Sequence, residues 1–361
     1  MTEHGDRMER ARSAMAGSGV HALCLSVGKD LPYLTGYSAM PLERLTMLVL
    51  PVVGEPVLVI PELEAPRVDS SVGGFSVRAW SETEDPIAIV DELLGDAATV
   101  AVGTETWSSF LLDLQDSTDR TWLGAGELMR SLRIINTDSE VEKLRAAGRS
   151  VDAVVDQMAA VRFSGRTEAD VAREFTERLI AEGHEAVDFA IVASGPNGAS
   201  PHHHPGDRLL ERGDAVVVDF GGFQDGYGSD TTRMFVVAEA PEGFDEAFEV
   251  LRAAQEAAVR HVRPGVTAAS VDATARGIIA EAGYGEFFIH RTGHGIGMDT
   301  HEHPYLVEGN TEELQPGMAF SVEPGIYLPG RWGMRLEDIV VVTESGVERL
   351  NNSDRAYRIV R

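Results

Sequence analysis

Short apolar runs alternate with polar, helix-like stretches through the first third of the chain. Four of these runs have the length of strands, and they cover residues 21–27, 46–51, 56–60 and 99–102. The tripeptide Val53-Gly54-Glu55 supplies a turn between the second run and the third. We therefore predict a small α/β domain in this part of the chain.

The pattern changes near Asn136, where apolar residues begin to recur at helical spacing. Thr137-Asp138-Ser139-Glu140 has the form of a capping box, and an amphipathic stretch continues from it to about Arg162. We place a domain boundary here. The N-terminal domain then covers residues 1–136, and a second domain covers residues 137–361.

The second domain contains a weak internal repeat at an offset of about 100 residues. Each copy has a helix, a glycine-containing break, a second helix capped by threonine, and a loop that leads to a hairpin. The matching residues are Val161-Arg162, Gly165, Thr167, Val171 and Gly183 in one copy and Val262-Arg263, Gly265, Thr267, Val271 and Gly283 in the other. The repeat predicts two related halves around a shared site, where pockets often form.

The first half carries a predicted hairpin with an acid on each strand. The apolar run 216–218 leads directly into Asp219, and Asp230 opens the run 231–237. The stretch between them, residues 221–228, is rich in turn-forming residues. This hairpin therefore offers two carboxylates close to its turn.

The second half repeats this arrangement. Residues 320–322 lead into Glu323, and after a loop rich in proline and glycine residues 334–336 lead into Glu337. Opposed residues of a hairpin have Cβ atoms roughly 5 Å apart, and two-metal hydrolases hold their ions about 3.5–4 Å apart. Two facing hairpins would therefore fill one dinuclear site.

His294 adds an imidazole to the four acids. It lies among Gly293, Gly295 and Gly297, which allow the backbone to approach a ligand closely. For any single acid, a strand end at the surface is the simpler interpretation. That interpretation does not explain why both hairpins do the same thing, whereas buried carboxylates that coordinate metal are readily retained.

The ligand chemistry narrows the choice of ion. Oxygen ligands with one imidazole suit manganese, cobalt or zinc in a reactive site better than a structural zinc, which prefers sulfur and nitrogen. Two such ions would lower the pKa of a bridging water toward neutrality and so supply a hydroxide nucleophile. No Gly-x-Ser-x-Gly, His-Glu-x-x-His or cysteine nucleophile motif competes with this interpretation.

Composition argues against several other classes of protein. The formal net charge of −27 would repel nucleic acid, and the two lysines, Lys29 and Lys143, do not follow a phosphate-binding loop. No apolar run approaches the roughly 18 residues of a membrane span, and residues 1–12 are charged where a signal peptide would be apolar. We expect a cytoplasmic protein with no membrane partner, in which the lone Cys24 is a buried apolar residue.

Two further histidines are suited to proton transfer or to binding a polarised carbonyl group. They are His202, in the stretch 194–202, and His301, seven residues after His294. His203, His204 and His303 are assigned surface or structural roles.

The motifs around these residues resemble those of the pita-bread metallopeptidases, which include methionine aminopeptidase, aminopeptidase P and prolidase. The resemblance spans residues from about 137 to 361. It rests on Val218-Asp219-Phe220-Gly221-Gly222, Ser229-Asp230-Thr231-Thr232-Arg233, Gly293-His294-Gly295-Ile296-Gly297, His301-Glu302-x-Pro304, Ser321-Val322-Glu323-Pro324-Gly325-Ile326-Tyr327 and Arg335-Leu336-Glu337-Asp338. The segment 32–37 resembles the creatinase-type N-terminal domain of the proline-cleaving members, which points away from methionine aminopeptidase.

The resemblance implies an α+β pita-bread catalytic domain with an internal pseudo-twofold duplication, preceded by a smaller α/β domain. It also implies a homodimer and a role for each residue of the site. Asp219 would hold one ion, His294 and Glu323 the other, and Asp230 and Glu337 would bridge both. Glu323 would also act as general base, His202 and His301 would stabilise the tetrahedral intermediate, and His290, Arg335 and Tyr327 would bind substrate or support the site.

We therefore expect a dinuclear, manganese-type metallopeptidase that hydrolyses the Xaa-Pro bond of dipeptides. Aminopeptidase P activity on longer peptides is the near alternative, because Tyr305 stands just after the His-Glu-x-Pro motif, where we expect prolidases to carry a basic residue. A metal-free creatinase-like hydrolase and a non-enzymatic pita-bread binding module are more distant alternatives. His290, with Phe287 and Phe288 before it, is a candidate wall for the proline ring, although the two phenylalanines also suit a core.

Overall fold

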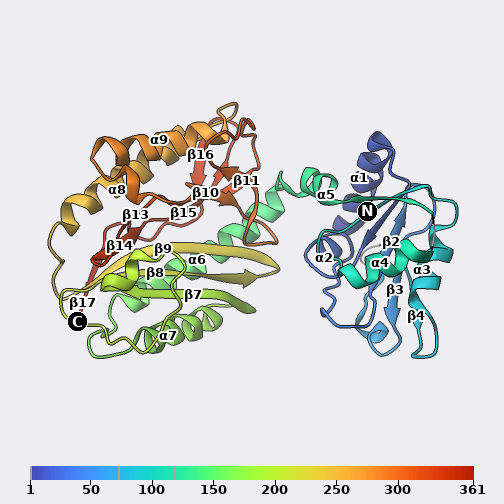
Figure 1. Ribbon diagram of the computed structural model, residues 1–361, viewed down its shortest axis with the longest axis horizontal. Helices are drawn as coiled ribbons and strands as arrows, with labels where there is room; N and C mark the ends of the chain where they lie inside the picture. The colour runs from blue at the N-terminus through green and yellow to red at the C-terminus, as the bar shows by residue number, and fades with distance from the viewer. Residues whose placement is uncertain (1, 72–73, 118) are drawn as a thin grey trace. The chain divides into compact units, whose positions relative to one another are not determined.

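The computed structural model describes residues 2–71, 74–117 and 119–361. The chain divides into two compact units, one that ends at Arg133 and one that spans Ile134–Arg361 (Figure 1). Among the residues described, no helix is both long and apolar enough to cross a membrane.

The first unit is built on a six-stranded mixed sheet in the order β4-β3-β2-β1-β5-β6. Its strands are β1 Ala22–Leu25, β2 Met47–Pro51, β3 Val57–Pro61, β4 Ser76–Trp80, β5 Thr99–Val102 and β6 Thr121–Gly124. Each of the four predicted runs overlaps one of these strands. Cys24 is fully buried in β1, as expected, and burial raises the pKa of its thiol to about 12.

Helices cover this first sheet. They are α1 Glu3–Ser18, α2 Asp30–Thr35, the 3₁₀ turn η1 Ala65–Arg67, α3 Pro86–Leu94, α4 Ser108–Ser117 and α5 Gly126–Arg133. Val90 and Leu94 of α3 and Leu114 of α4 pack in one cluster with Cys24 and Val100 of the sheet. This amphipathic packing gives the first unit a hydrophobic core of its own.

The second unit begins with the capped helix that the sequence predicts. In α6, Asp138–Met158, the Thr137 side chain accepts the Glu140 N–H while the Glu140 carboxylate accepts the Thr137 N–H. The helix ends at Met158 and does not continue to Arg162. Short i→i−3 bonds from Ala160 and Val161 close its last turn.

The internal repeat is visible in the structure. α7, Glu168–Ala181, and α9, Ala268–Glu281, stand at an offset of 100 residues, and each is capped by a threonine side chain, Thr167 or Thr267. The equivalent glycines Gly183 and Gly283 adopt positive φ angles of 107° and 87° just past the helix ends. α6 with α7 and α8, Phe244–His261, with α9 therefore form corresponding helix pairs.

The hairpin predicted for the first half is longer and tighter than expected. β8, Ala215–Gln224, and β9, Tyr227–Val237, continue through the stretch 221–228 and leave only Asp225-Gly226 in the turn. Both turn residues have positive φ angles, 51° and 72°, as a two-residue hairpin loop requires. The hairpin is therefore present as predicted, but most of the stretch expected to form the turn is strand, because Gly221, Gly222 and Gly228 lie inside the strands.

The hairpin of the second half is interrupted once. β12, Ala319–Val322, pairs with β15, Asp338–Val342, and beyond a break β13, Gly325–Leu328, pairs with β14, Trp332–Arg335. The pairings Val322 with Asp338 and Gly325 with Arg335 share one register. Glu323 and Glu337 therefore fall opposite each other in the break.

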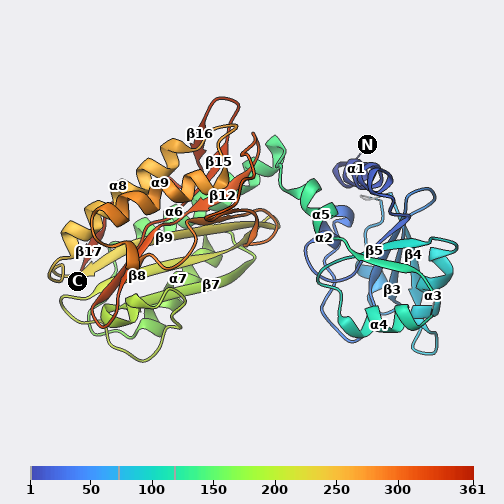
Figure 2. The same cartoon turned by 45° about the horizontal axis from the view of Figure 1, so that its top comes forward.

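These hairpins belong to two sheets, ordered β17-β9-β8-β7 and β11-β10-β12-β15-β16, with β13-β14 as a separate pair. The remaining strands are β7 Ala186–Ser194, β10 Gly293–Gly295, β11 Glu302–Leu306, β16 Val347–Arg349 and β17 Arg358–Val360. In both views α6 and α7 cover one side of the strands, and α8 and α9 cover the other (Figures 1 and 2).

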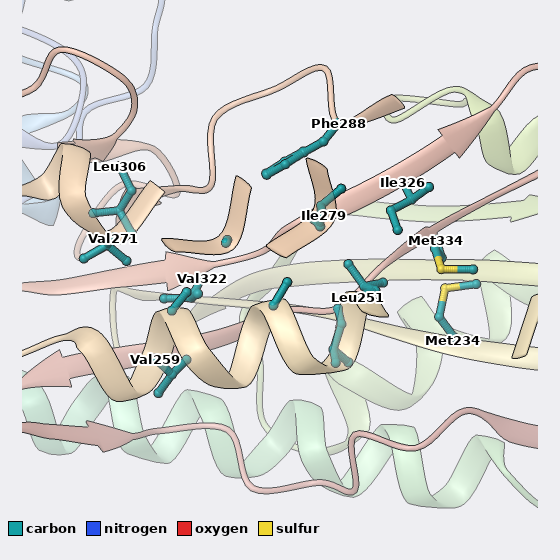
Figure 3. Close-up of a cluster of buried hydrophobic side chains, with 14 of the residues drawn as sticks. Met234, Leu251, Val259, Val271, Ile279, Phe288, Leu306, Val322, Ile326 and Met334 are labelled. Atoms are coloured by element: carbon teal, nitrogen blue, oxygen red, sulfur yellow. The ribbon is translucent and has the colours of Figure 1, made fainter. Parts of the chain in front are cut away.

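β8 has no free face. Val216, Val218 and Phe220 pack with α6 and α7, whereas Ala215 and Val217 point into the larger cluster shared with α8 and α9. That larger cluster includes Leu251, Val259, Val271 and Ile279 from the helices and Val322, Ile326 and Met334 from the strands (Figure 3). Because side chains alternate along a strand, the residues that follow Val217 on its face point toward the second hairpin.

A fully buried ion pair joins the two hairpins. Arg233 of β9 lies 2.7 Å from Asp338 of β15, and neither side chain is exposed to solvent. The same guanidinium donates to the main-chain oxygen of Glu337 and, at 3.0 Å, to that of Thr232. Arg233 therefore fixes the backbone that carries Glu337, a residue of the predicted site.

Replacing Arg233 with methionine should destabilise the protein by about 3 kcal/mol. Removing one partner of a buried pair usually costs about 3–5 kcal/mol, and we expect the lower value because Arg349 and Arg355 also contact Asp338. Urea denaturation measures the change. The matched control is Arg252→Met, which breaks an exposed pair with Glu249 and should cost less than about 1 kcal/mol. Equal losses in both variants would contradict the structural role of Arg233.

Candidate metal centre and active site

A cavity of about 760 Å³ opens between the two hairpins of the second unit. It is lined by Asp188, Phe189, Ala190, Ile191, Pro201, His202, His203, His204, Pro205, Asp219, Asp230, His290, Arg291, His294, Thr300, His301, Glu323, Arg335 and Glu337. All the predicted site residues are in this set except Tyr327, which contacts two members of the set from behind.

The two acids of the first hairpin lie on one face of the β8–β9 ladder. Asp219 pairs with Thr232 and Asp230 pairs with Gly221, so the two aspartates are diagonal neighbours and are not directly opposed. Both are buried, with 7% and 4% of their surface exposed. They share the face of Val217, which directs them toward the second hairpin.

The second hairpin brings its acids to the same place. Asp230, His294 and Glu337 each offer a ligand atom, and these atoms lie within 4.8 Å of one another. Glu323 joins them, because one of its carboxylate oxygens lies 3.3 Å from His294 Nε2. The structure therefore gathers the residues at which the sequence predicted metal ligands into one cluster.

The hydrogen bonds of His294 identify its free nitrogen. Nδ1 lies 3.1 Å from the carbonyl oxygen of Gly295, which can only accept, so Nδ1 carries the proton. Nε2 is left with a lone pair that faces Glu323 and, at 3.6 Å, Asp230. A neutral imidazole with one bonded nitrogen and one free nitrogen is the usual form of a metal ligand.

Without a cation, the cluster is electrostatically strained. Burial and repulsion from Asp219 raise the pKa of Asp230 well above its usual range, and burial and repulsion from Asp230 do the same for Glu337. Burial raises the pKa of Glu323 to about 7 despite the opposing effect of Arg335. Burial likewise lowers the pKa of His294 to about 3, which keeps its imidazole neutral.

The unused oxygens of these acids show that the site suits a cation. Asp219 Oδ1, Asp230 Oδ1 and Glu337 Oε1 are buried and have no hydrogen-bond partner in the part of the chain that the structure describes. Buried polar atoms are normally paired, and buried carboxylates normally hold a cation or a donor. The donor set, mostly oxygen with one imidazole, matches divalent ions such as manganese, cobalt or zinc.

A chain of polar contacts supports the cluster from behind. His290 Nε2 lies 2.8 Å from the Tyr327 hydroxyl, which also accepts from Arg335 at 2.8 Å. Arg335 in turn donates to Asp219 at 2.5 Å and, through Nε, to Thr232 at 3.0 Å. The Thr232 hydroxyl donates to Glu337 at 2.8 Å. Tyr327 thus positions His290 and Arg335 without lining the cavity itself.

The two histidines assigned to chemistry lie on the open side of the cavity. His202 and His301 are both exposed, whereas His294 is buried. The rings of His301 and His294 meet edge to face at 4.1 Å between centroids. Partial withdrawal of the ring from water and the charge of Arg291 lower the pKa of His301, which favours the neutral imidazole.

The loop that carries His202 is held by a residue that the sequence did not single out. Glu168, fully buried at the start of α7, accepts the Ser194 N–H at 2.7 Å and contacts His203 Nε2 at 2.7 Å and Asn197 Nδ2 at 3.1 Å. In sequence, Glu168 looks like an ordinary acid in the first turn of a helix. Its partners are 26 to 35 residues away, so no local signal marks them.

The second half has a counterpart in Asp272 of α9. It accepts the N–H and hydroxyl of Thr292 at 3.2 and 2.7 Å and pairs with Arg276 at 2.9 Å. Arg276 also donates to the main-chain oxygens of Phe288 and His290. Each helix pair therefore uses one buried acid to fix a segment that lines the cavity.

Two expectations about the surroundings of the site need correction. Phe288 is a core residue and Phe287 packs against that core, so of the proposed proline wall only His290 lines the cavity. Gly293 and Gly295 are required by neighbouring strands: a Cβ atom on them would meet the main-chain oxygens of Ser321 and His303. These two glycines therefore allow neighbouring strands to pack closely, whereas we had expected them to allow the backbone to approach a ligand.

Comparison with known proteins matches each part of the chain to a protein family model. The model for metallopeptidase family M24 matches residues 142–344, and the model for the creatinase/prolidase N-terminal domain matches residues 7–135. These matches confirm the predicted fold class.

Two solved structures and one named protein are similar to this chain over nearly its whole length. The crystal structure of dipeptidase PepE from Mycobacterium ulcerans has a TM-score of 0.93 at 46% identity and covers 99% of this chain and 98% of its own. A prolidase from Thermococcus sibiricus has a TM-score of 0.94 at 35% identity, with 99% of each chain covered. A Lactobacillus helveticus protein called Xaa-Pro dipeptidase is 36% identical over 91% of this chain and 92% of its own.

His184 should make the fold sensitive to acid. Its ring is buried beneath the first hairpin, 2.7 Å from the Ser229 hydroxyl, and burial lowers its pKa from 6.5 to about 4. Below pH 6.5 the unfolded chain takes up a proton at this position that the folded chain refuses until about pH 4. Stability therefore falls as the pH drops through this window, by at most about 3 kcal/mol.

The test compares His184→Gln with the unchanged protein in urea denaturation at pH 7 and pH 4.5 after treatment with a chelator. The variant should lose distinctly less stability between the two pH values. His204→Gln, which alters an exposed histidine, serves as the control and should behave like the unchanged protein. The same pH dependence in all three proteins would refute a contribution from His184.

Proposed function

This chain belongs to metallopeptidase family M24, and on that premise we propose that it is a dipeptidase that hydrolyses the peptide bond before proline in Xaa-Pro dipeptides. The observation that carries the proposal is the group of four acids and one imidazole that lines a cavity large enough for a dipeptide. Whole-chain similarity to proteins called prolidase or dipeptidase supports the choice of substrate.

Asp219 would hold one of two divalent ions, His294 and Glu323 would hold the other, and Asp230 and Glu337 would be shared between the two ions. We propose manganese, with cobalt and zinc as alternatives, because the donors are mainly oxygen. The bound ions would supply Lewis acidity and lower the pKa of water at the site. The unpaired oxygens of Asp219, Asp230 and Glu337 support this assignment.

Side chains of the protein would transfer the proton and bind the substrate. Glu323, the least buried of the four acids, would take a proton from the attacking water, because it lines the cavity and 14% of its side-chain surface is exposed. His202 and His301 would donate hydrogen bonds to the carbonyl oxygen as negative charge develops on it. Arg335 would hold Asp219 in place through their 2.5 Å contact.

Selection of proline would depend on shape. A Xaa-Pro amide has no N–H, and its ring fixes φ, so the site needs an apolar surface and no acceptor for the scissile nitrogen. Phe189, Ile191, Pro201 and Pro205 give the cavity such surfaces, and His290, which contacts the Tyr327 hydroxyl, lines the same cavity.

Cleavage of longer peptides that begin with Xaa-Pro is the second candidate function. Tyr305, where we expected a basic residue in a dipeptidase, favours it. The metal-free hydrolase and the binding module are set aside, because the chain is a member of a metallopeptidase family and retains all five candidate ligands.

We further propose that residues 137–361 form the catalytic domain, because every residue of the site lies there, and that residues 1–136 form the accompanying domain. The family resemblance supports a homodimer. The single, buried Cys24 is consistent with the cytoplasmic location that we propose.

Replacing Glu337 with glutamine should reduce the metal content from two ions per chain to one or none and lower kcat/KM by more than about 100-fold. A shared carboxylate neutralises both cations, whereas loss of an outer contact to a metal ligand typically costs about 10–100-fold. Elemental analysis and kinetics on the same sample measure both effects. Exposed Glu344→Gln is the control. Two bound ions with near-normal turnover in Glu337→Gln would rule out the shared-ligand assignment.

The metal-loaded enzyme should prefer Ala-Pro over Ala-Ala by at least about tenfold in kcat/KM. A pocket shaped to a ring discriminates by about 1–3 kcal/mol against a side chain that lacks a few methylene groups. Parallel assays of both dipeptides with each candidate metal provide the measurement. Equal values would identify a general dipeptidase.

A further inference from the structure

One acid that lines the cavity is not among the candidate metal ligands. Asp188 is exposed, whereas Asp219, Asp230 and Glu337 are buried. The Asp188 carboxylate accepts the Thr300 hydroxyl at 3.0 Å, and it forms no ion pair with any residue that the structure describes. Asp188 therefore brings a negative charge to the wall of the cavity that no cationic side chain of the protein neutralises.

The backbone of β7 places Asp188 at this wall. Val187 pairs with Gly222 of β8 and Phe189 pairs with Gly221, so Asp188 is the extra residue of a β-bulge. Consecutive residues of a regular strand point to opposite faces of the sheet, yet Asp188 and Phe189 both line the cavity. The bulge, which redirects side chains, accounts for this arrangement.

Asp188 lies near one of the two histidines assigned to chemistry. Its hydrogen-bond partner Thr300 directly precedes His301. Partial withdrawal from water lowers the pKa of His301, and the negative charge of Asp188 opposes this change. Because His301 is proposed to bind the carbonyl group of Xaa, Asp188 would lie beside the residue that precedes proline.

Two cationic groups of a dipeptide could pair with Asp188. The α-ammonium group is two bonds from the scissile carbonyl carbon, so it must stay close to the candidate metal ligands during the reaction. A lysine or arginine side chain instead carries its charge at the end of three or four methylene groups. An exposed acid that is not part of the metal cluster is better placed for this second kind of cation.

We infer that Asp188 binds the cationic side chain of Xaa and makes Lys-Pro and Arg-Pro preferred substrates. This inference rests on the proposed function and makes it more specific. Phe189, which lines the cavity next to Asp188, would contact the methylene groups of the same side chain. Thr300 would hold the carboxylate in place through its hydroxyl.

The experiment compares Lys-Pro, Met-Pro and Glu-Pro, which share one scissile bond and differ in the charge of an unbranched side chain. The unchanged, metal-loaded enzyme should prefer Lys-Pro to Met-Pro by about 3- to 10-fold in kcat/KM, between the effects of an exposed ion pair and of a hydrogen bond to a charged group. Glu-Pro should be the poorest of the three. Raising the ionic strength from about 0.05 M to about 0.5 M should reduce these differences.

Asp188→Asn should remove the preference for Lys-Pro and change kcat/KM for Met-Pro by less than about twofold. Asparagine keeps the shape of the side chain and an oxygen that can accept the Thr300 hydroxyl, so only the charge is lost. Asp188→Lys reverses the charge and should favour Glu-Pro over Lys-Pro.

The matched control is Glu185→Gln. It neutralises an exposed acid three residues before Asp188 that does not line the cavity, and it should leave all three rates unchanged. Metal content and thermal unfolding, measured on each variant, exclude loss of the ions or of the fold as the cause.

The inference would be overturned if the unchanged enzyme cleaved Lys-Pro and Met-Pro equally. It would also fail if Asp188→Asn kept the preference, which would then come from the overall negative charge of the protein. Equal slowing of all three substrates by Asp188→Asn would instead assign Asp188 to the α-ammonium group or to positioning His301. In each case the proposed activity would stand, whereas failure of the unchanged enzyme to cleave any Xaa-Pro dipeptide would refute the proposed function.

Discussion

Mutual repulsion among four clustered carboxylates, three of them buried, is the constraint on which the rest of the second unit depends. Asp219, Asp230, Glu323 and Glu337 converge in one cavity, and burial together with this repulsion raises the pKa of at least three of them. Hydrophobic packing alone does not hold like charges together. The cluster therefore needs a rigid frame to impose it and cations to neutralise it.

The frame comes from two hairpins whose strands are buried on both sides. In β8 the residues on either face of the strand belong to two different hydrophobic clusters, so rotation of Asp219 out of the cavity would pull apolar groups from both. Arg233 then ties β9 to the backbone at Glu337 and Asp338. The hairpins differ in regularity: the first is continuous, whereas the second breaks at Glu323 and Glu337, which frees their side chains to meet the first.

The sequence was sufficient to predict those features whose signals are local. The capping box at Thr137, the repeated threonine caps and the acids at the ends of apolar runs all depend on neighbouring residues, and the structure contains each of them. The role of Glu168 could not be predicted in this way. Glu168 is defined by donors at least 26 residues away, which only the folded chain brings to it. The two-residue turn at Asp225 was missed because glycines that allow close strand packing resemble glycines that form loops.

The Thr232 hydroxyl offers a route to redesigning the cation preference without reshaping the cavity. This one oxygen accepts a hydrogen bond from the Arg335 guanidinium and donates one to the Glu337 carboxylate, so it couples the orientations of these two side chains. Valine has nearly the same volume but no hydroxyl. Replacing Thr232 with valine would remove one hydrogen bond from the Glu337 carboxylate and so change how strongly its oxygens bind a metal ion. Thr232 does not line the cavity, so the surfaces that contact the peptide would stay intact.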